Sequence, residues 1–169
     1  MRPRMELLVL LFLHVVASAL WASAAVVQGF FLVPAIFDAG PGGGAVMAGI
    51  TKRKFVPFML IVSWTALLTG LRLYSIRFSS AWVTTPEGIV LSLGTLLAIS
   101  AAVIGMARQK PTAEKLAALA SEIKGAPTPA QAQEMAALGQ RLVKIARVTA
   151  YHLLAALVLM ASHRLAAVL

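Results

Sequence analysis

The sequence has no cysteine and little charge, above all little negative charge. Zero cysteines exclude disulfides, thiolate metal sites, iron–sulfur clusters and cysteine nucleophiles. Only 12% of the 169 residues are charged, whereas soluble domains have about 25%. The 60% hydrophobic content and the mean hydropathy of +0.86 exceed what a soluble protein of this size can bury. Because disordered chains are poor in apolar residues, the composition indicates an integral membrane protein.

Four stretches are long and apolar enough to cross about 30 Å of hydrocarbon, which takes roughly 20 helical residues. Lipid offers the backbone no hydrogen-bonding partner, so each stretch is expected to be a helix. The predicted fold is all-α, a single membrane domain over residues 1–169 with four transmembrane helices at about 7–36, 55–76, 87–107 and 142–168. The first stretch is overlong and is expected to tilt, kink or project. It resembles a signal peptide at its start, but its apolar sequence continues through Phe37, which favours a retained helix.

A polar connection of about residues 110–140 precedes the last stretch. Apolar residues recur at helical spacing from Pro111 to Ile123, and Gly125 and Pro127 then end this amphipathic helix. The segment Thr128–Gln131 is typical of a capping box with proline at the first helical position. We therefore expect a helical hairpin whose second arm continues into the last span. Such a basic hairpin lies on a membrane surface, against a partner protein or in solvent.

Positive charge is abundant, since 15 lysines and arginines give a formal net charge of +9. They lie in the connections, where lipid headgroups and orientation signals explain them better than nucleic acid does. No nucleic-acid partner is expected. Ten of them lie in or directly beside the first and third connections, including Lys52, Arg53 and Lys54, against five elsewhere. The positive-inside rule therefore predicts a cytoplasmic hairpin with both termini outside, in what is expected to be a bacterial inner membrane.

Catalytic patterns are missing from the sequence. No Asp or Glu lies inside the apolar stretches away from their ends, and no set of nucleophile, base and orienting acid is recognisable. The chain is therefore expected not to be an enzyme, and a carboxylate-coupled transporter is disfavoured. The leading hypothesis is a non-catalytic accessory or scaffolding subunit of a larger respiratory or photosynthetic membrane complex. Its partners would be the lipid bilayer and other membrane subunits; the cofactor is left open, with none favoured over haem b or copper.

The histidines are the residues that could carry chemistry inside the membrane. His14, Trp21 and Gln28 are spaced seven apart, so they share one helix face, which is expected to turn towards the bundle. His152 and His163 are 11 apart and fall within about 20° of one face of the last helix. Because antiparallel helices bring His14 and His163 to similar depth, imidazoles there could ligate haem iron or copper. Each histidine could equally be a structural hydrogen-bonding group.

Other residues in the stretches have two interpretations. Gly94, Ala98 and Ala102 recur at steps of four and predict a small-residue face, which packs against this chain or against a partner. Methionines such as Met160 could be soft ligands to Cu(I) or apolar packing. Arg72 is expected to reach the membrane interface. Its alternative role is to neutralise a carboxylate or a haem propionate.

The first two stretches resemble the copper-resistance D (CopD-like) membrane family over about residues 10–75. The matching features are His14, Trp21, Pro34-Ala35, Lys52-Arg53-Lys54 and Thr69-Gly70-Leu71. The His–Trp spacing is also similar to that of HemJ-type protoporphyrinogen oxidases, which are four-helix, haem-linked membrane proteins. A lysine and an acid of these patterns are missing from the third and last spans, so only His14 carries over, as a candidate haem or metal ligand. The alternative function is a haem b- or copper-binding module of the copper-resistance type, in which the resemblance suggests His14 and helical spacing and depth suggest His163 or His152 as its partner.

Overall fold

The computed structural model describes residues 2–40, 43–123 and 125–166, with side chains from Arg4 to His163 outside the gaps. No strand occurs in this part of the chain, which is built almost wholly of helix. Arg2, Lys124 and Arg164, which contribute to the predicted charge asymmetry, have side chains outside the described set.

Four long helical segments make up the fold, joined by two short helices. The long segments are α1 (Arg2–Val27) with the π-helical turn η1 (Gln28–Leu32) and α2 (Val33–Asp38); α4 (Phe55–Arg77); α6 (Pro86–Ile104) with the π-helical turn η3 (Gly105–Gln109) and α7 (Lys110–Glu122); and α8 (Pro129–Ala166). The connections contain α3 (Gly43–Lys52) and α5 (Ser80–Val83). All four long segments are sufficiently long and apolar to cross a membrane. The all-α, four-helix prediction is thereby confirmed, and the chain has the character of an integral membrane protein.

Side-chain hydrogen bonds cap the first turns of α6 and α8. The Thr85 hydroxyl accepts a hydrogen bond from the Gly88 amide at 3.1 Å, and Pro86 occupies the first turn of α6. At the start of α8, the Gln131 amide donates to the Thr128 hydroxyl at 3.3 Å, while the Thr128 amide donates to Gln131 Oε1 at 2.9 Å. This reciprocal pair is the predicted capping box.

The two π-helical turns have a common cause. Each ends two residues before a proline, η1 before Pro34 and η3 before Pro111. A proline inside a helix lacks the N–H of the ladder and its ring clashes with the carbonyl of the preceding turn, and a wider turn relieves that clash. The helices therefore continue past their prolines. As a result, α6, η3 and α7 form one uninterrupted helix from Pro86 to Glu122, and the predicted amphipathic helix is its extension.

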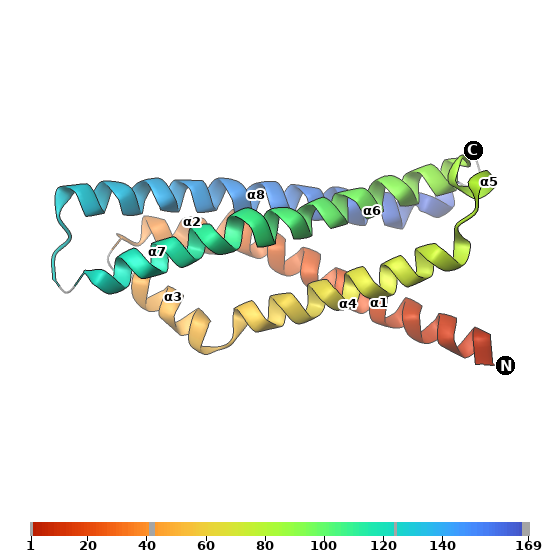
Figure 1. Cartoon of the computed structure of the whole chain (residues 1–169), viewed down its shortest axis with the longest axis horizontal. Helices are drawn as coiled ribbons and strands as arrows, with labels where there is room; N and C mark the ends of the chain where they lie inside the picture. The colour runs from red at the N-terminus through yellow and green to blue at the C-terminus, as the bar shows by residue number, and fades with distance from the viewer. Residues whose placement is uncertain (1, 41–42, 124, 167–169) are drawn as a thin grey trace.

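The long segments form two pairs (Figure 1). α1 packs on α4, and α6 packs on α8. α8 also contacts α1 and η1, whereas α4 and α6 touch only sparsely. α1 begins and α8 ends at the same end of the molecule, and the two pairs diverge towards it in Figure 1. Small side chains let the pairs approach at their centre; the buried core comprises Ala17, Trp21, Ala22, Ala25, Val62, Ala66, Ala101 and Leu153.

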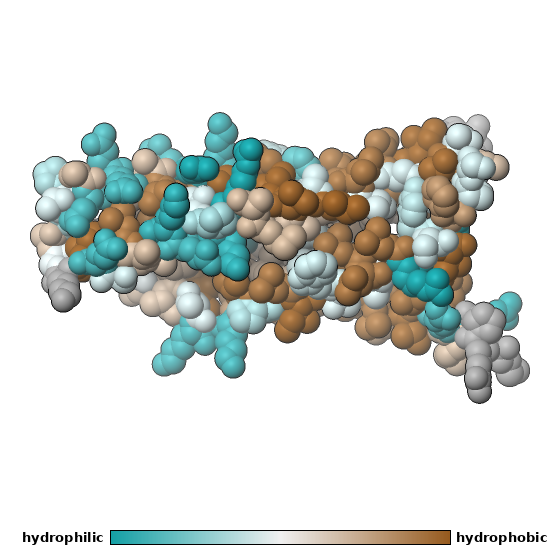
Figure 2. Space-filling view, in the orientation of Figure 1, coloured by the Kyte–Doolittle hydropathy of each residue, from teal (hydrophilic) through white to brown (hydrophobic). Residues whose placement is uncertain are grey.

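Surface polarity divides the molecule along its length. Polar side chains gather over the α7–α8 hairpin end, and apolar ones cover most of the other half (Figure 2). Few side chains of the spanning segments are buried within the chain, with α8 the most covered at 39% of its most apolar window. Exposed apolar helices of this kind contact lipid. The hairpin therefore extends two spanning helices beyond the apolar half.

Candidate cofactor-binding cavity

A cavity of about 440 Å³ lies between the diverging helix pairs. Its walls come from α1, α4, α6 and α8 and are mostly apolar, as at Leu11, Leu67 and Leu157. The polar side chains that line it are His14, Ser18, Tyr74, Arg77, Thr95 and His163. Ligand sites in proteins have this character, with volumes of roughly 300–1,000 Å³ and a few convergent polar groups in an apolar wall.

His14 is held by the neighbouring helix of its own pair. Its Nδ1 lies 2.9 Å from the backbone oxygen of Ala66 on α4, with Thr69 Oγ1 3.5 Å away. A carbonyl oxygen can only accept, so Nδ1 carries the hydrogen and Nε2 of the neutral ring carries the lone pair. No described residue forms a hydrogen bond with this Nε2.

Gly70 makes the space for this imidazole. A Cβ atom at Gly70 would lie 2.6 Å from Cε1 and 3.0 Å from Nδ1 of His14. Any larger residue would therefore displace the ring. Thr69 and Gly70, which are among the features behind the family resemblance, thus lie directly against the His14 ring.

His163 lines the same cavity from α8, as the predicted depth match with His14 requires. Its Nδ1 donates to the Met160 carbonyl at 2.6 Å, which again leaves Nε2 with a lone pair and no described partner. Met160 also lines the cavity. The predicted pair of His14 and His163 therefore shares one site.

His152 does not join this pair. Its Nδ1 donates to the Val148 carbonyl one turn earlier at 2.8 Å, and its side chain is not part of the cavity wall. Of the two histidines on α8, the structure thus brings only His163 to the site of His14.

The rim at the end where α1 begins is made by polar and aromatic side chains. Tyr74 of α4 hydrogen-bonds with Ser92 of α6 at 2.7 Å, and its ring meets Trp82 of α5 edge to face at 5.5 Å. Arg77 donates to Glu87 at 2.7 Å. These contacts join the two helix pairs at one end of the cavity.

The rim residues were not predicted from the sequence. Arg72, for which a cofactor role was considered, instead donates to Glu6 at 3.0 Å in an exposed ion pair and does not line the cavity. Arg77 is the cavity arginine, and the signal for it is its place one turn after Tyr74 and one short connection before Glu87.

The predicted packing residues lie inside the chain. Trp21 is buried, 6% exposed, and Ala98 and Ala102 pack against the core that it belongs to. A Cβ at Gly94 would lie 3.1 Å from Met160 Cγ, so this small-residue face receives α8. Gln28 begins η1 and is half-buried. The basic Lys52, Arg53 and Lys54 are exposed at the junction of α3 and α4.

The donor set suits some cofactors better than others. Among the described residues, no group of three or more His, Asp or Glu side chains could hold a metal ion. Two imidazoles, with the Met160 thioether nearby, remain as donors at the cavity. A haem needs only axial ligands from the protein because the porphyrin supplies the others. The residues present therefore fit a haem better than a lone metal ion.

Comparison with protein-family models gives no match, and neither curated proteins nor solved structures show significant similarity to this chain. The resemblance to the CopD-like and HemJ-type families thus stays a prediction. The fold and the cavity define a class, a helical integral membrane protein with two histidines lining one internal cavity.

Proposed function

We propose that this chain is a non-catalytic integral membrane protein that binds haem b between its helix pairs, where His14 and His163 would hold the iron. The observation that supports this function is that both imidazoles line one cavity with Nδ1 bonded to a backbone carbonyl. Ligating histidines are oriented by such a bond, which leaves the other nitrogen for the metal. When bound, haem b supplies one-electron transfer.

The remaining groups of the cavity fit the same ligand. The apolar walls would receive the macrocycle, and Arg77 at the rim, which is paired with Glu87, would add a donor for a propionate. Copper is the second candidate cofactor, because the Met160 thioether is a soft ligand of the kind that suits Cu(I).

Absorption spectra of the detergent-purified chain test the proposal, oxidised and dithionite-reduced, with metal analysis of the same sample. We expect a Soret band and sharp reduced bands that disappear in His14→Ala and His163→Ala. His152→Ala is the matched control and should retain the full haem content, because His152 lies on the same helix but outside the cavity. Unchanged haem in His14→Ala, or a blank spectrum after expression with added haem, contradicts haem binding. Stoichiometric copper without haem assigns the cavity to copper instead.

We also keep the role of an accessory subunit, which is compatible with a bound haem. The small-residue face of α6 is used within the chain, so a partner subunit would pack on the exposed apolar surface of α1 and α4, for example at Phe12 and Ile61. This hypothesis predicts co-migration with other membrane proteins in native gels, and a stable monomer under all solubilisation conditions contradicts it.

For the orientation, we propose a bacterial inner membrane with the hairpin in the cytoplasm. It is supported by the exposed cations at the α3–α4 junction and along the polar half of α8, which lie towards the hairpin side of the apolar half.

A further inference from the structure

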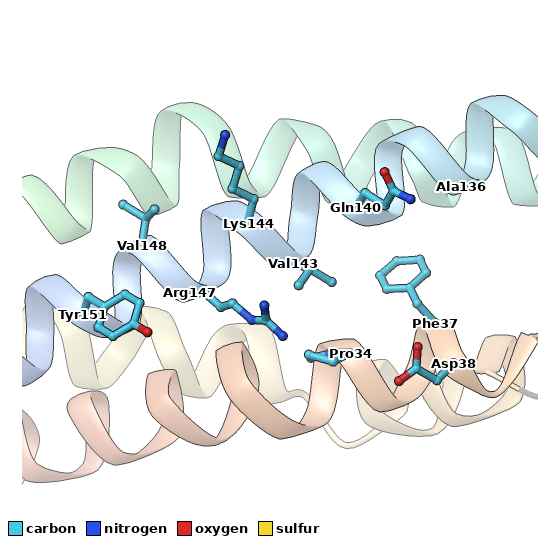
Figure 3. Close-up of a pocket in the computed structure, with 10 residues that line it drawn as sticks. All are labelled: Pro34, Phe37, Asp38, Ala136, Gln140, Val143, Lys144, Arg147, Val148 and Tyr151. Carbon is cyan, nitrogen blue, oxygen red and sulfur yellow. The ribbon is translucent and has the colours of Figure 1, made fainter.

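A second hollow lies on the outside of the bundle, in the other half of the molecule. It is a groove of about 700 Å³ between α2 and α8. α2 contributes Pro34, Phe37 and Asp38, and α8 contributes mainly the side chains from Gln140 to Tyr151 (Figure 3). None of its lining residues lines the cavity between the helix pairs.

The groove crosses the boundary between polar and apolar surface. Towards the hairpin it is lined by Gln140 and Lys144, and Arg147 follows one turn later. Beyond Arg147 the exposed face of α8 becomes apolar, with Tyr151 59%, Leu154 43% and Val158 59% exposed. Tyrosine at such a boundary is typical of the membrane interface, where headgroups begin.

Tyr151 is fixed in place at this boundary. Its ring meets Phe30 of η1 edge to face with centroids 5.1 Å apart. This pair joins α8 to the first helix directly beside the groove. Beyond Arg147, α8 thus presents exposed apolar side chains next to its contact with the first helix, and acyl chains pack on surfaces of this kind.

The cations of the groove have no carboxylate partner among the described residues. Neither Arg147 nor Lys144 forms an ion pair within 4.0 Å there, although Asp38 lines the same groove. In Figure 3 the Arg147 guanidinium lies between α8 and α2 near Pro34, whereas Asp38 lies at the other end beside Phe37. The Arg147 guanidinium therefore lies next to the apolar part of α8, whereas the Asp38 carboxylate lies nearer the hairpin end of the groove.

We propose that this groove is a binding site for one anionic glycerophospholipid. Arg147 binds the phosphate, because a guanidinium offers several donors to phosphate oxygens in a fixed geometry. The acyl chains run over Tyr151 and Leu154. The Lys144 ammonium points away from α2 in Figure 3 and adds only longer-range positive charge, and Asp38 accepts hydrogen bonds from headgroup hydroxyls such as those of phosphatidylglycerol. Basic grooves between spanning helices on the cytoplasmic side bind anionic headgroups in this way.

Native mass spectrometry of the full-length chain in detergent tests the proposal. The probes are phosphatidylglycerol, phosphatidylethanolamine and phosphatidylcholine at equal concentration, and inorganic phosphate as competitor. We expect phosphatidylglycerol to be retained preferentially, with an apparent affinity about fivefold lower in Arg147→Gln, as expected for removal of one interfacial cation. Arg141→Gln is the matched control, since Arg141 is exposed on the same helix but does not line the groove. It should retain the lipid as the unchanged chain does.

Several outcomes overturn the site. Equal retention of phosphatidylcholine, or an equal loss in Arg141→Gln and Arg147→Gln, shows only bulk attraction of lipid to a basic protein. Displacement of the lipid by inorganic phosphate assigns the cation to a free anion. Preferential retention of phosphatidylethanolamine that falls in Asp38→Asn assigns the groove to a zwitterionic lipid. Arg147→Lys, which keeps the charge, should bind between the unchanged chain and Arg147→Gln, and it separates lipid binding from any folding defect.

Discussion

Each of the three histidines donates its Nδ1 hydrogen to a backbone carbonyl, but only His14 does so across helices. Its acceptor, Ala66, lies 52 residues away, whereas His152 and His163 bond to carbonyls of their own turn. His14 therefore contributes to the packing of α1 on α4 as well as to the cavity. A hydrogen bond of this kind stabilises a fold by about 0.5–1.5 kcal/mol. Loss of haem in His14→Ala thus combines the loss of a ligand with the loss of this hydrogen bond.

Gly70→Ala keeps the imidazole of His14 but moves it. The added methyl would lie 2.6 Å from His14 Cε1, so the ring must move and its bond to Ala66 is strained. We expect loss of most of the haem and a destabilisation of about 1–3 kcal/mol, the usual cost of overpacking. Haem content from the reduced spectrum and unfolding in denaturing detergent measure the two effects. Gly105→Ala is the control, because a Cβ there meets nothing within 4 Å. Full haem occupancy in Gly70→Ala would show that the ring position does not matter for binding.

At the scale of elements, the sequence predicted the cap of the last helix but not the continuity of the third. Cap chemistry is local, so Thr128 and Gln131 were recognisable from a four-residue segment. Hydropathy indicates where lipid contact ends and not where the backbone stops being helical, so the uninterrupted helix to Glu122 was not predicted. η3 carries the helix past Pro111 into polar sequence. The rim of the cavity was unpredictable for a related reason, since Trp82 and Arg77 meet their partners only through the fold of the connection around α5.

The close contact of η1 with α8 depends on Gly29. A Cβ at this position would lie 2.8 Å from the Ala146 carbonyl oxygen, which is backbone and cannot move aside. We expect Gly29→Ala to cost about 1–3 kcal/mol of stability by separating the first helix from α8. Gly105→Ala in the other π-helical turn should be neutral or slightly stabilising, because alanine favours helix over glycine by about 1 kcal/mol. Equal unfolding midpoints for Gly29→Ala and Gly105→Ala would contradict the close approach of η1 to α8.

The capping box of α8 gives a prediction for the hairpin. Thr128→Ala removes the hydroxyl that accepts from the Gln131 amide, which should cost about 1 kcal/mol. We expect faster amide hydrogen exchange over the first turns of α8, with no change in the membrane-spanning half. Ser121→Ala is the control, since that hydroxyl bonds only to a carbonyl of its own helix. Unchanged exchange near residue 131 would show that the cap contributes nothing.

At the scale of the whole molecule, the sequence yields four spans and a charge asymmetry but not the divergence of the two pairs. Span number and depth follow from hydropathy and helical rise, which is why His14 and His163 could be matched in advance. The cavity results from the sum of many contacts along α1, α4, α6 and α8, and no local pattern encodes that sum. The proposed orientation in the membrane depends on how the lysines and arginines are distributed over the two ends of the molecule.

The absence of cysteine offers a direct test of orientation. Gly125→Cys places a thiol in the hairpin turn, where a Cβ meets nothing within 4 Å, and Ser80→Cys places one on exposed α5 at the opposite end. With the hairpin in the cytoplasm, a membrane-impermeant maleimide should label only Ser80→Cys in intact cells. Labelling of Gly125→Cys should require permeabilised membranes. The reverse pattern would invert the proposed topology.

The sparse contact between α4 and α6 has a consequence for the order of assembly. During synthesis, α1 and α4 emerge first, and they can already form their mutual packing and the bond from His14 to Ala66. The opposite wall of the cavity does not exist until α8, the last helix, has left the ribosome. A prosthetic group held between the pairs is therefore captured at the end of biogenesis, when the second pair docks onto a first pair that is already folded.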